Sequence, residues 1–176
     1  MTPVILERQF RSAVDPAGFM RIVGDSADCL PLYRVAWHES LLAADGSRLL
    51  CRFDAPDTEA VRIVGRRPEV ESALAWAGTV HDTGREGLAN VVVERAFSEP
   101  VNVESLQAIE DAGALCMELH RVTFLRTFFS LDSRRMLCLY QAPDAESVRL
   151  AQRQAGMPLE RVWACRHYTV GNLPGG

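Results

Sequence analysis

The chain has 176 residues, of which 48% are hydrophobic and 24% are charged, and its formal net charge is −4. This composition is ordinary for a globular protein, and an acidic chain without a basic run is a poor partner for nucleic acid or an anionic membrane. No stretch approaches the ~20 apolar residues of a membrane span, and the N-terminus lacks the pattern of a secretory signal. We therefore expect a cytoplasmic protein that binds neither nucleic acid nor membrane.

The first half of the chain predicts the element order β-α-β-β-α-β. Apolar and β-branched runs alternate with amphipathic segments and turn residues, and Asp45-Gly46 is a hairpin signal because glycine accepts a positive φ. The expected elements are a strand at 4–10, a helix at about 16–32, strands at 35–44 and 47–54, a helix at 57–67 and a strand at 74–81.

The second half predicts the same order again. Asp144 could either cap the second helix of this half or face its N-terminus, and this helix is expected to end near Gly156 and Pro158. The expected elements are strands at 91–97, 121–130, 135–141 and 161–168, a hairpin turn at 131–134, a helix at about 103–120 and a helix that starts within 142–146.

The two halves match each other at a spacing of 87 residues. Residues 4–83 and 91–170 share 24 identities in 80 positions, including Glu7-Arg8 with Glu94-Arg95 and Trp76-Ala77 with Trp163-Ala164. We therefore predict an α+β chain of two ferredoxin-like βαββαβ repeats, 1–83 and 91–170. Each sheet would have helices on one face only, so we expect the open faces to pack together as an intramolecular pseudo-dimeric α+β barrel, with further oligomerisation possible.

The second repeat resembles a known family. The residues that carry the likeness are 134–149, then Ala155-Gly156-Met157-Pro158 and Arg161-Val162-Trp163. They resemble a family of small ferredoxin-like proteins long catalogued as a domain of unknown function and often labelled nickel-binding. The resemblance implies the fold, assembly through the open sheet face, and nickel as a candidate ligand. It supplies no set of nickel-binding residues for these positions.

Two matched glutamates are the first candidates for chemistry. Glu7 and Glu94 lie within apolar first strands, and the alternation of side chains points both toward the open face of their sheets. A carboxylate there could act as a general base or as an oxygen ligand for a metal ion. The alternative is a structural ion pair with an arginine, for which the candidates are Arg34, Arg121, Arg48 and Arg135.

Histidines and cysteines offer one further metal site. None of the four histidines has a histidine at the matched position, so a duplicated metal site is not expected. A single site could form from His38 with Glu7 or Cys51, although a surface or core-edge role is the ordinary interpretation of such a histidine. The five cysteines are expected to be free thiols, with the matched pairs Cys51/Cys138 and Cys29/Cys116 in the core.

Three functions remain open. The first is a small binding protein that holds a metal ion, nickel by resemblance, or a small apolar ligand between the repeats. The second is a cofactor-free isomerase, cyclase or oxygenase for a small aromatic or polyketide-like substrate, with Glu7 or Glu94 as base and His38 and Arg126 positioning the substrate. The third is a structural or regulatory partner protein. The sequence lacks the CxxC, HExxH, phosphate-loop and Gly-x-Ser-x-Gly motifs.

Overall fold

The computed structural model of the protein describes residues 1–173 and has a mixed α/β fold with antiparallel sheets. The chain forms two compact units. Unit 1 comprises residues 1–78 and the segment from 166 onward, and unit 2 comprises residues 79–165. No helix in the described part of the chain combines the length and the apolar character that crossing a membrane requires.

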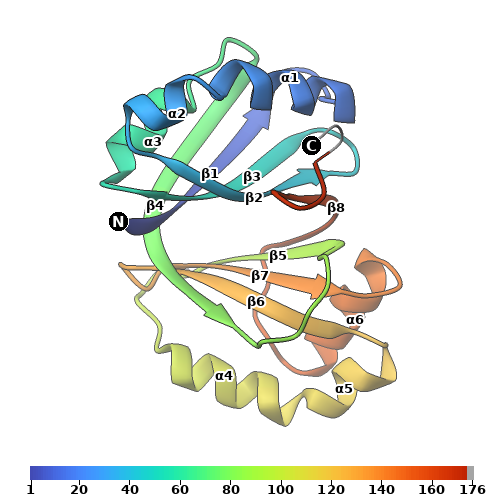
Figure 1. Ribbon diagram of the computed structural model, residues 1–176. Coiled ribbons are helices and arrows are strands. Elements are labelled where there is room, and N and C mark those ends of the chain that lie inside the picture. The colour runs from blue at the N-terminus through green and yellow to red at the C-terminus, as the bar shows by residue number, and fades with distance from the viewer. Residues whose placement is uncertain (174–176) are drawn as a thin grey trace. The chain divides into compact units, whose positions relative to one another are not determined.

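Unit 1 is a sheet with its helices on one face (Figure 1). The strand order is β4-β1-β3-β2, and all three pairings are antiparallel. The elements are β1 (Thr2–Phe10), α1 (Pro16–Ser26), α2 (Cys29–Leu32), β2 (Ala36–Ala43), β3 (Arg48–Ala55), α3 (Thr58–Val64) and β4 (Val70–Asp82). The last residues of β4, from Thr79, belong to unit 2.

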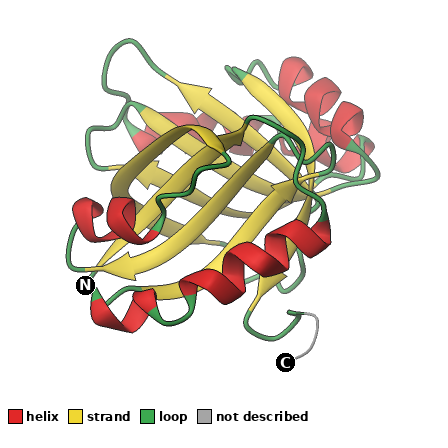
Figure 2. Cartoon of the chain, turned by 90° about the horizontal axis from the view of Figure 1, so that it is seen from above, coloured by secondary structure: helices red, strands yellow, loops and turns green. Residues whose placement is uncertain are grey.

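Unit 2 has the same order of elements, and its helices also cover one face of the sheet (Figures 1 and 2). The strand order is β8-β5-β7-β6, again antiparallel. The elements are β5 (Val91–Ala96), α4 (Val103–Ala112), α5 (Ala114–Leu119), β6 (Thr123–Ser130), β7 (Arg135–Gln141), α6 (Ala145–Gln154) and β8 (Arg161–Thr169), whose end from Arg166 belongs to unit 1.

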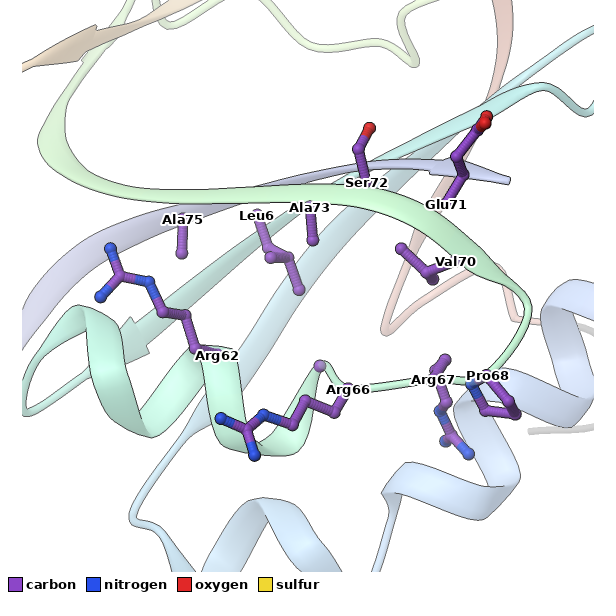
Figure 3. Close-up of a pocket in the computed structure, with 11 residues that line it drawn as sticks. Leu6, Arg62, Arg66, Arg67, Pro68, Val70, Glu71, Ser72, Ala73 and Ala75 are labelled. Atoms are coloured by element: carbon purple, nitrogen blue, oxygen red, sulfur yellow. The ribbon is translucent and has the colours of Figure 1, made fainter. Parts of the chain in front are cut away.

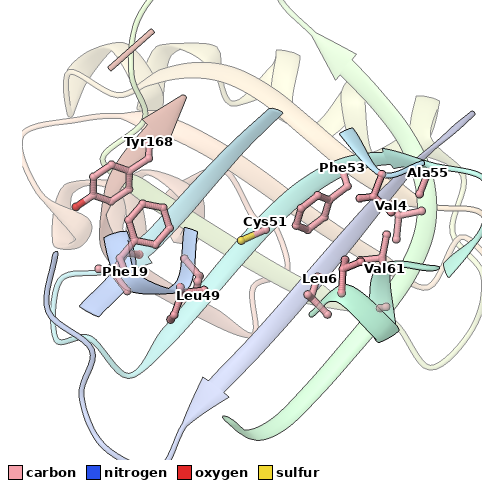
Figure 4. Packing of buried hydrophobic residues seen from close by; sticks show 14 of the residues in the cluster. Val4, Leu6, Phe19, Leu49, Cys51, Phe53, Ala55, Val61 and Tyr168 are labelled. Atoms are coloured by element: carbon pink, nitrogen blue, oxygen red, sulfur yellow. The ribbon is translucent and has the colours of Figure 1, made fainter. Parts of the chain in front are cut away.

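The core of unit 1 lies between the sheet and its helices. Every second residue of the strands faces this core, as the pleat of a strand requires, and Val4 and Leu6 of β1 pack with Cys51 and Phe53 of β3 (Figure 4). Phe19 of α1 stacks on Tyr168 with ring centroids 4.3 Å apart. The sheet face toward the helices is therefore apolar, and any polar side chain on it is an exception.

Two predicted helices are each broken into two. The helix expected at 16–32 consists of α1 and α2, and the one expected at 103–120 consists of α4 and α5, separated by Gly113. The expected core position of Cys29 is also wrong, because this thiol is exposed beside the break. The other thiols are free as predicted, with Cys51 and Cys138 buried and Cys116 half-buried.

The helix starts follow from their capping residues. Asp57 and Asp144 accept hydrogen bonds from the backbone N–H groups of Ala60 and Ser147, at 2.8 and 2.7 Å. Of the two roles that the sequence left open for Asp144, the structure shows the N-cap. An N-cap carboxylate satisfies a backbone donor that the helix itself leaves unpaired.

Replacing Gly113 with alanine is expected to destabilise the protein by about 1–3 kcal/mol through overpacking. A Cβ atom at this position would lie 2.4 Å from the Cβ atom of Ala155, at the end of α6. Gly24 is the control, because a Cβ atom there would meet nothing within 4 Å. Denaturant unfolding should show a loss for Gly113→Ala and no loss for Gly24→Ala, and equal behaviour of the two variants would contradict the packing argument.

Candidate functional site

A buried arginine is one exception on the helix-facing side of the unit 1 sheet. Arg8 follows Val4 and Leu6 by steps of two on β1 and therefore shares their face. The residue is only 5% exposed. One guanidinium nitrogen, Nη2, lies 3.2 Å from the sulfur of Cys51, whereas the buried Nε has no hydrogen-bond partner. Among the described residues, no carboxylate pairs with Arg8, so its charge is buried without compensation.

Cys51 also connects Arg8 to two other polar groups. Its sulfur lies 2.9 Å from the hydroxyl of Ser40, and the indole N–H of Trp37 donates to the same hydroxyl at 2.8 Å. These contacts place one hydroxyl, one thiol and one guanidinium side by side on β2, β3 and β1. The sheet thus presents a short polar strip to an otherwise apolar core.

A pocket opens over this strip. It has a volume of about 110 Å³, and we call it the Arg8 pocket. Its floor is the polar strip, and its apolar walls come from α1, α2, α3 and the strands, mainly Phe19, Ile22, Leu30, Trp37, Phe53 and Val64. An apolar cavity with a few converging polar groups is the usual form of a small-molecule site.

The matched region of unit 2 is built differently. Arg95 lies 87 residues after Arg8 and is also buried, but its guanidinium donates to the side-chain oxygen of Gln152. Gln152 also donates to the Tyr140 hydroxyl at 3.2 Å, and Tyr140 donates to Glu110 at 2.8 Å. The cavity beside Glu110 holds about 50 Å³ and is not lined by Arg95. Unit 2 therefore provides Arg95 with polar neighbours, although its buried Nε and Nη1, like the Nε of Arg8, have no hydrogen-bond partner.

The charge of Glu110 is part of that arrangement. Burial raises the pKa of the Glu110 carboxyl above its ordinary value, while the hydrogen bond from Tyr140 and the positive charge of Arg95 oppose the rise. The carboxylate and Arg95 thus stabilise each other's charged form.

The two predicted glutamates accept hydrogen bonds from matched tryptophans. Glu7 accepts from the indole N–H of Trp76 at 2.5 Å, and Glu94 accepts from that of Trp163 at 2.7 Å. Glu94 also pairs with Arg161 at 2.9 Å. Glutamate pairing with an arginine was the alternative left open by the sequence, although Arg161 was not among the predicted partners. A catalytic role for either glutamate stays a prediction.

The predicted metal ligands are not brought together. Cys51 faces the helices with Arg8, whereas Glu7 lies on the other face of the sheet. The His38 side chain is 35% exposed, and its Nε2 lies 2.8 Å from a carboxylate oxygen of Asp54. Within residues 1–173, no three histidine, cysteine, aspartate or glutamate side chains lie close enough to hold a metal ion. Arg126, the other predicted positioning residue, pairs with Asp82 at 3.2 Å.

Sequence reasoning missed a second buried polar cluster in unit 1. Glu39 is 1% exposed, accepts from Arg52 at 2.6 Å, and lies 2.8 Å from His167. Glu39 and His167 are 128 residues apart in the chain. Cross-strand pairing places Glu39 opposite Arg52, which could have been inferred once the hairpin was predicted.

A larger depression in unit 1 is less suited to a ligand. It has a volume of about 590 Å³ and lies along β4 beside α3 (Figure 3). Arg62 and Arg66 are exposed, and Arg62 pairs with Glu59. Arg67 also lines the depression, but its guanidinium already donates to Asp25, Ser26 and the carbonyl oxygen of Ile22.

Part of the chain matches a known protein family. Residues 92–164 match the family of nickel responsive proteins similar to SCO4226. The match confirms the resemblance found in the sequence, and it spans less than half of the chain. The solved structure of SCO4226 from Streptomyces coelicolor A3(2) is 19% identical, with a TM-score of 0.38, over 42% of this chain and 91% of its own. No curated protein is similar enough in sequence to count as a relative.

Two solved structures resemble nearly the whole chain. One is TA0507, which is provisionally assigned as a chlorite dismutase; it is 8% identical, has a TM-score of 0.52 and covers 98% of both chains. The other is a heme-binding protein from Thermus thermophilus, which is 8% identical, has a TM-score of 0.51 and covers 94% of this chain and 91% of its own. At this identity the likeness extends to the fold alone.

Burial sets the reactivity of one further thiol. Burial raises the pKa of the Cys165 thiol to about 12, so native Cys165 stays protonated and should resist alkylation at pH 8, while exposed Cys29 reacts.

Between pH 9 and 12 the unfolded thiol loses its proton and the folded one keeps it, so folding stability falls as the pH rises. Replacing Cys165 with alanine should remove up to about 1.4 kcal/mol of that loss per pH unit above 9. Identical pH profiles for both proteins, or fast native labelling of Cys165, would contradict this.

Proposed function

We propose that the protein is a small-ligand-binding protein and that the Arg8 pocket is its site. The observation that carries the proposal is the pocket itself: apolar walls end on the buried Ser40, Cys51 and Arg8, and Arg8 has an unpartnered nitrogen. Buried polar groups in proteins are nearly always hydrogen-bonded, and those left without a partner call for an explanation. A ligand that reaches the polar floor would supply the missing partner.

The volume limits the size of the ligand. An engineered apolar cavity of roughly 150 Å³ binds benzene. The Arg8 pocket is smaller, at about 110 Å³, and the exposed Ala27 is among its lining residues, so it suits a short aliphatic chain or one ring that it does not fully enclose. A tetrapyrrole or polyketide is too large for it.

The proposal contains no metal ion. The matched family is described as nickel responsive, but Glu7, His38 and Cys51 do not converge, and the sole cysteine of the pocket is bonded to Arg8 and Ser40. A cation beside an uncompensated guanidinium would be repelled. Nickel binding by this chain therefore stays a prediction from the resemblance.

Titration calorimetry with single-ring compounds tests the proposal. We expect at least one of benzoate, benzyl alcohol and toluene to bind with a one-to-one stoichiometry. Replacing Leu30 with tryptophan fills the pocket and should weaken binding at least tenfold. Leu32→Trp is the matched control, because Leu32 lies on the same helix and is 79% exposed. Failure of all three compounds to bind, or equal binding by the two variants, would overturn the proposal.

A further inference from the structure

We infer that the ligand of the Arg8 pocket carries a carboxylate or a similar single negative charge, which pairs with the Arg8 guanidinium. This inference rests on the proposed function and names the chemical class of its ligand. It comes from a comparison of the two buried arginines, Arg8 and Arg95, in their own units.

In unit 1, one glycine and two apolar residues occupy the positions that match the polar neighbours of Arg95 in unit 2. Gly65, Phe53 and Val23 lie 87 residues before Gln152, Tyr140 and Glu110. All three unit 1 residues line the Arg8 pocket. The amide that accepts from Arg95, the hydroxyl that supports this amide and the nearby carboxylate therefore have no counterpart beside Arg8.

Without these polar side chains, unit 1 has a larger cavity beside its buried arginine. The pocket beside Arg8 is about 110 Å³, whereas the matched cavity in unit 2 is about 50 Å³. Gly65 contributes by having no side chain where Gln152 extends toward its arginine. The Arg8 pocket thus lies at the positions that the polar partners of Arg95 occupy in unit 2.

Arg8 is the single charged group among the residues that line the pocket. Its side chain is buried, so water cannot solvate it freely, and among the described residues it lacks the amide acceptor and the nearby carboxylate that Arg95 has. A buried charge without a partner is costly, and a carboxylate is the partner whose planar geometry fits a guanidinium with two parallel hydrogen bonds. A neutral ligand would leave the charge uncompensated.

The surrounding groups favour an anion that is otherwise apolar. Ser40 accepts from Trp37, so its own hydroxyl hydrogen can be donated to a ligand oxygen. The other lining residues offer mainly hydrocarbon and aromatic surface, and the hydroxyl of Ser26 is already bonded to Ile22 and Arg67. Benzoate and short fatty acids combine one carboxylate with an apolar body of suitable size. Sugar phosphates and nucleotides carry too much polar surface for these walls.

The test compares benzoate with benzyl alcohol, a neutral compound of nearly the same shape, by calorimetry at pH 7. The wild-type protein should bind benzoate at least tenfold more tightly. Arg8→Met should remove this preference by weakening benzoate binding and leaving benzyl alcohol binding nearly unchanged.

A second variant keeps the arginine and supplies an internal carboxylate. Val23→Glu introduces the acidic residue that unit 2 has at Glu110, and it should abolish the preference for benzoate. Val23→Gln has the same length without the charge and should retain the preference. This pair gives a result even if Arg8→Met does not fold.

The outcomes separate the inference from the proposed function. If benzyl alcohol binds as tightly as benzoate to the wild-type protein, or if folded Arg8→Met keeps the preference, the inference is overturned and the pocket still binds ligands. If the preference survives Val23→Glu, the charge of Arg8 is not its origin. If neither compound binds, the proposed function fails together with the inference.

Discussion

Replacing Arg8 with methionine is expected to raise the free energy of unfolding by about 1–3 kcal/mol, whereas Arg95→Met should lower it by about 3 kcal/mol. Both arginines are buried, but Arg8 has no carboxylate or amide partner among the described residues, while Arg95 donates to Gln152 and interacts with Glu110. Methionine keeps most of the apolar stem in both cases. The opposite signs follow because the first change removes an uncompensated charge and the second breaks a polar network.

Urea unfolding followed by circular dichroism measures both changes. Arg62→Met is the control for loss of an exposed arginine, since Arg62 pairs with Glu59 on the surface, and it should change stability by less than about 0.5 kcal/mol. If Arg8→Met is as destabilising as Arg95→Met, then the Arg8 charge is compensated and the argument for an anionic ligand loses its basis.

Replacing Glu39 with alanine is expected to lower the free energy of unfolding by about 3–5 kcal/mol. Glu39 is fully buried and bonds both Arg52 and His167, the latter in a different strand, β8. Its loss leaves the partly buried Arg52 and the buried His167 without this carboxylate. It also creates a cavity, which adds to the cost.

Glu59→Ala is the matched control for this variant. Glu59 is an exposed glutamate on α3 that also pairs with an arginine, so the two changes remove the same chemical group from different environments. Thermal unfolding should show a large decrease in Tm for Glu39→Ala and almost none for Glu59→Ala. A small effect at Glu39 would indicate that water replaces the carboxylate in this cluster.

Local signals made most of the fold predictable. The strand at 135–141, the turn at 131–134 and the helix start next to Asp144 appear as expected, because each depends on residues within a few positions of one another. The helix breaks at Ala27 and Gly113 were missed, because they depend on packing: Gly113 allows close approach of Ala155, which comes 42 residues later. The division into repeats at 1–83 and 91–170 stays a proposal, as does their packing as a pseudo-dimeric barrel.

The candidate site was less predictable, because it is defined by what is missing. The sequence drew attention to residues that both halves share, such as Glu7 and Glu94, and these turned out to accept hydrogen bonds from tryptophans. The pocket arises where the halves differ, at Gly65 and Val23. The sequence does contain a relevant difference: both halves have an arginine at the matched position, but only the second half has polar residues at the positions of Gln152 and Glu110. This difference becomes meaningful only when the structure shows that Gln152 and Glu110 lie near Arg95.

The central claim is that a ligand enters the Arg8 pocket, and nuclear magnetic resonance of the side-chain N–H groups tests it most directly. Arg8 and Trp37 both line the pocket, and the Trp37 indole N–H donates to Ser40, which also lines it. Titration with benzoate should shift the side-chain N–H signals of Arg8 and Trp37 together, in a saturable manner, while the indole signals of Trp76 and Trp163 change little. Shifts that favour Trp76 or Trp163 and leave Arg8 and Trp37 unchanged would contradict the account.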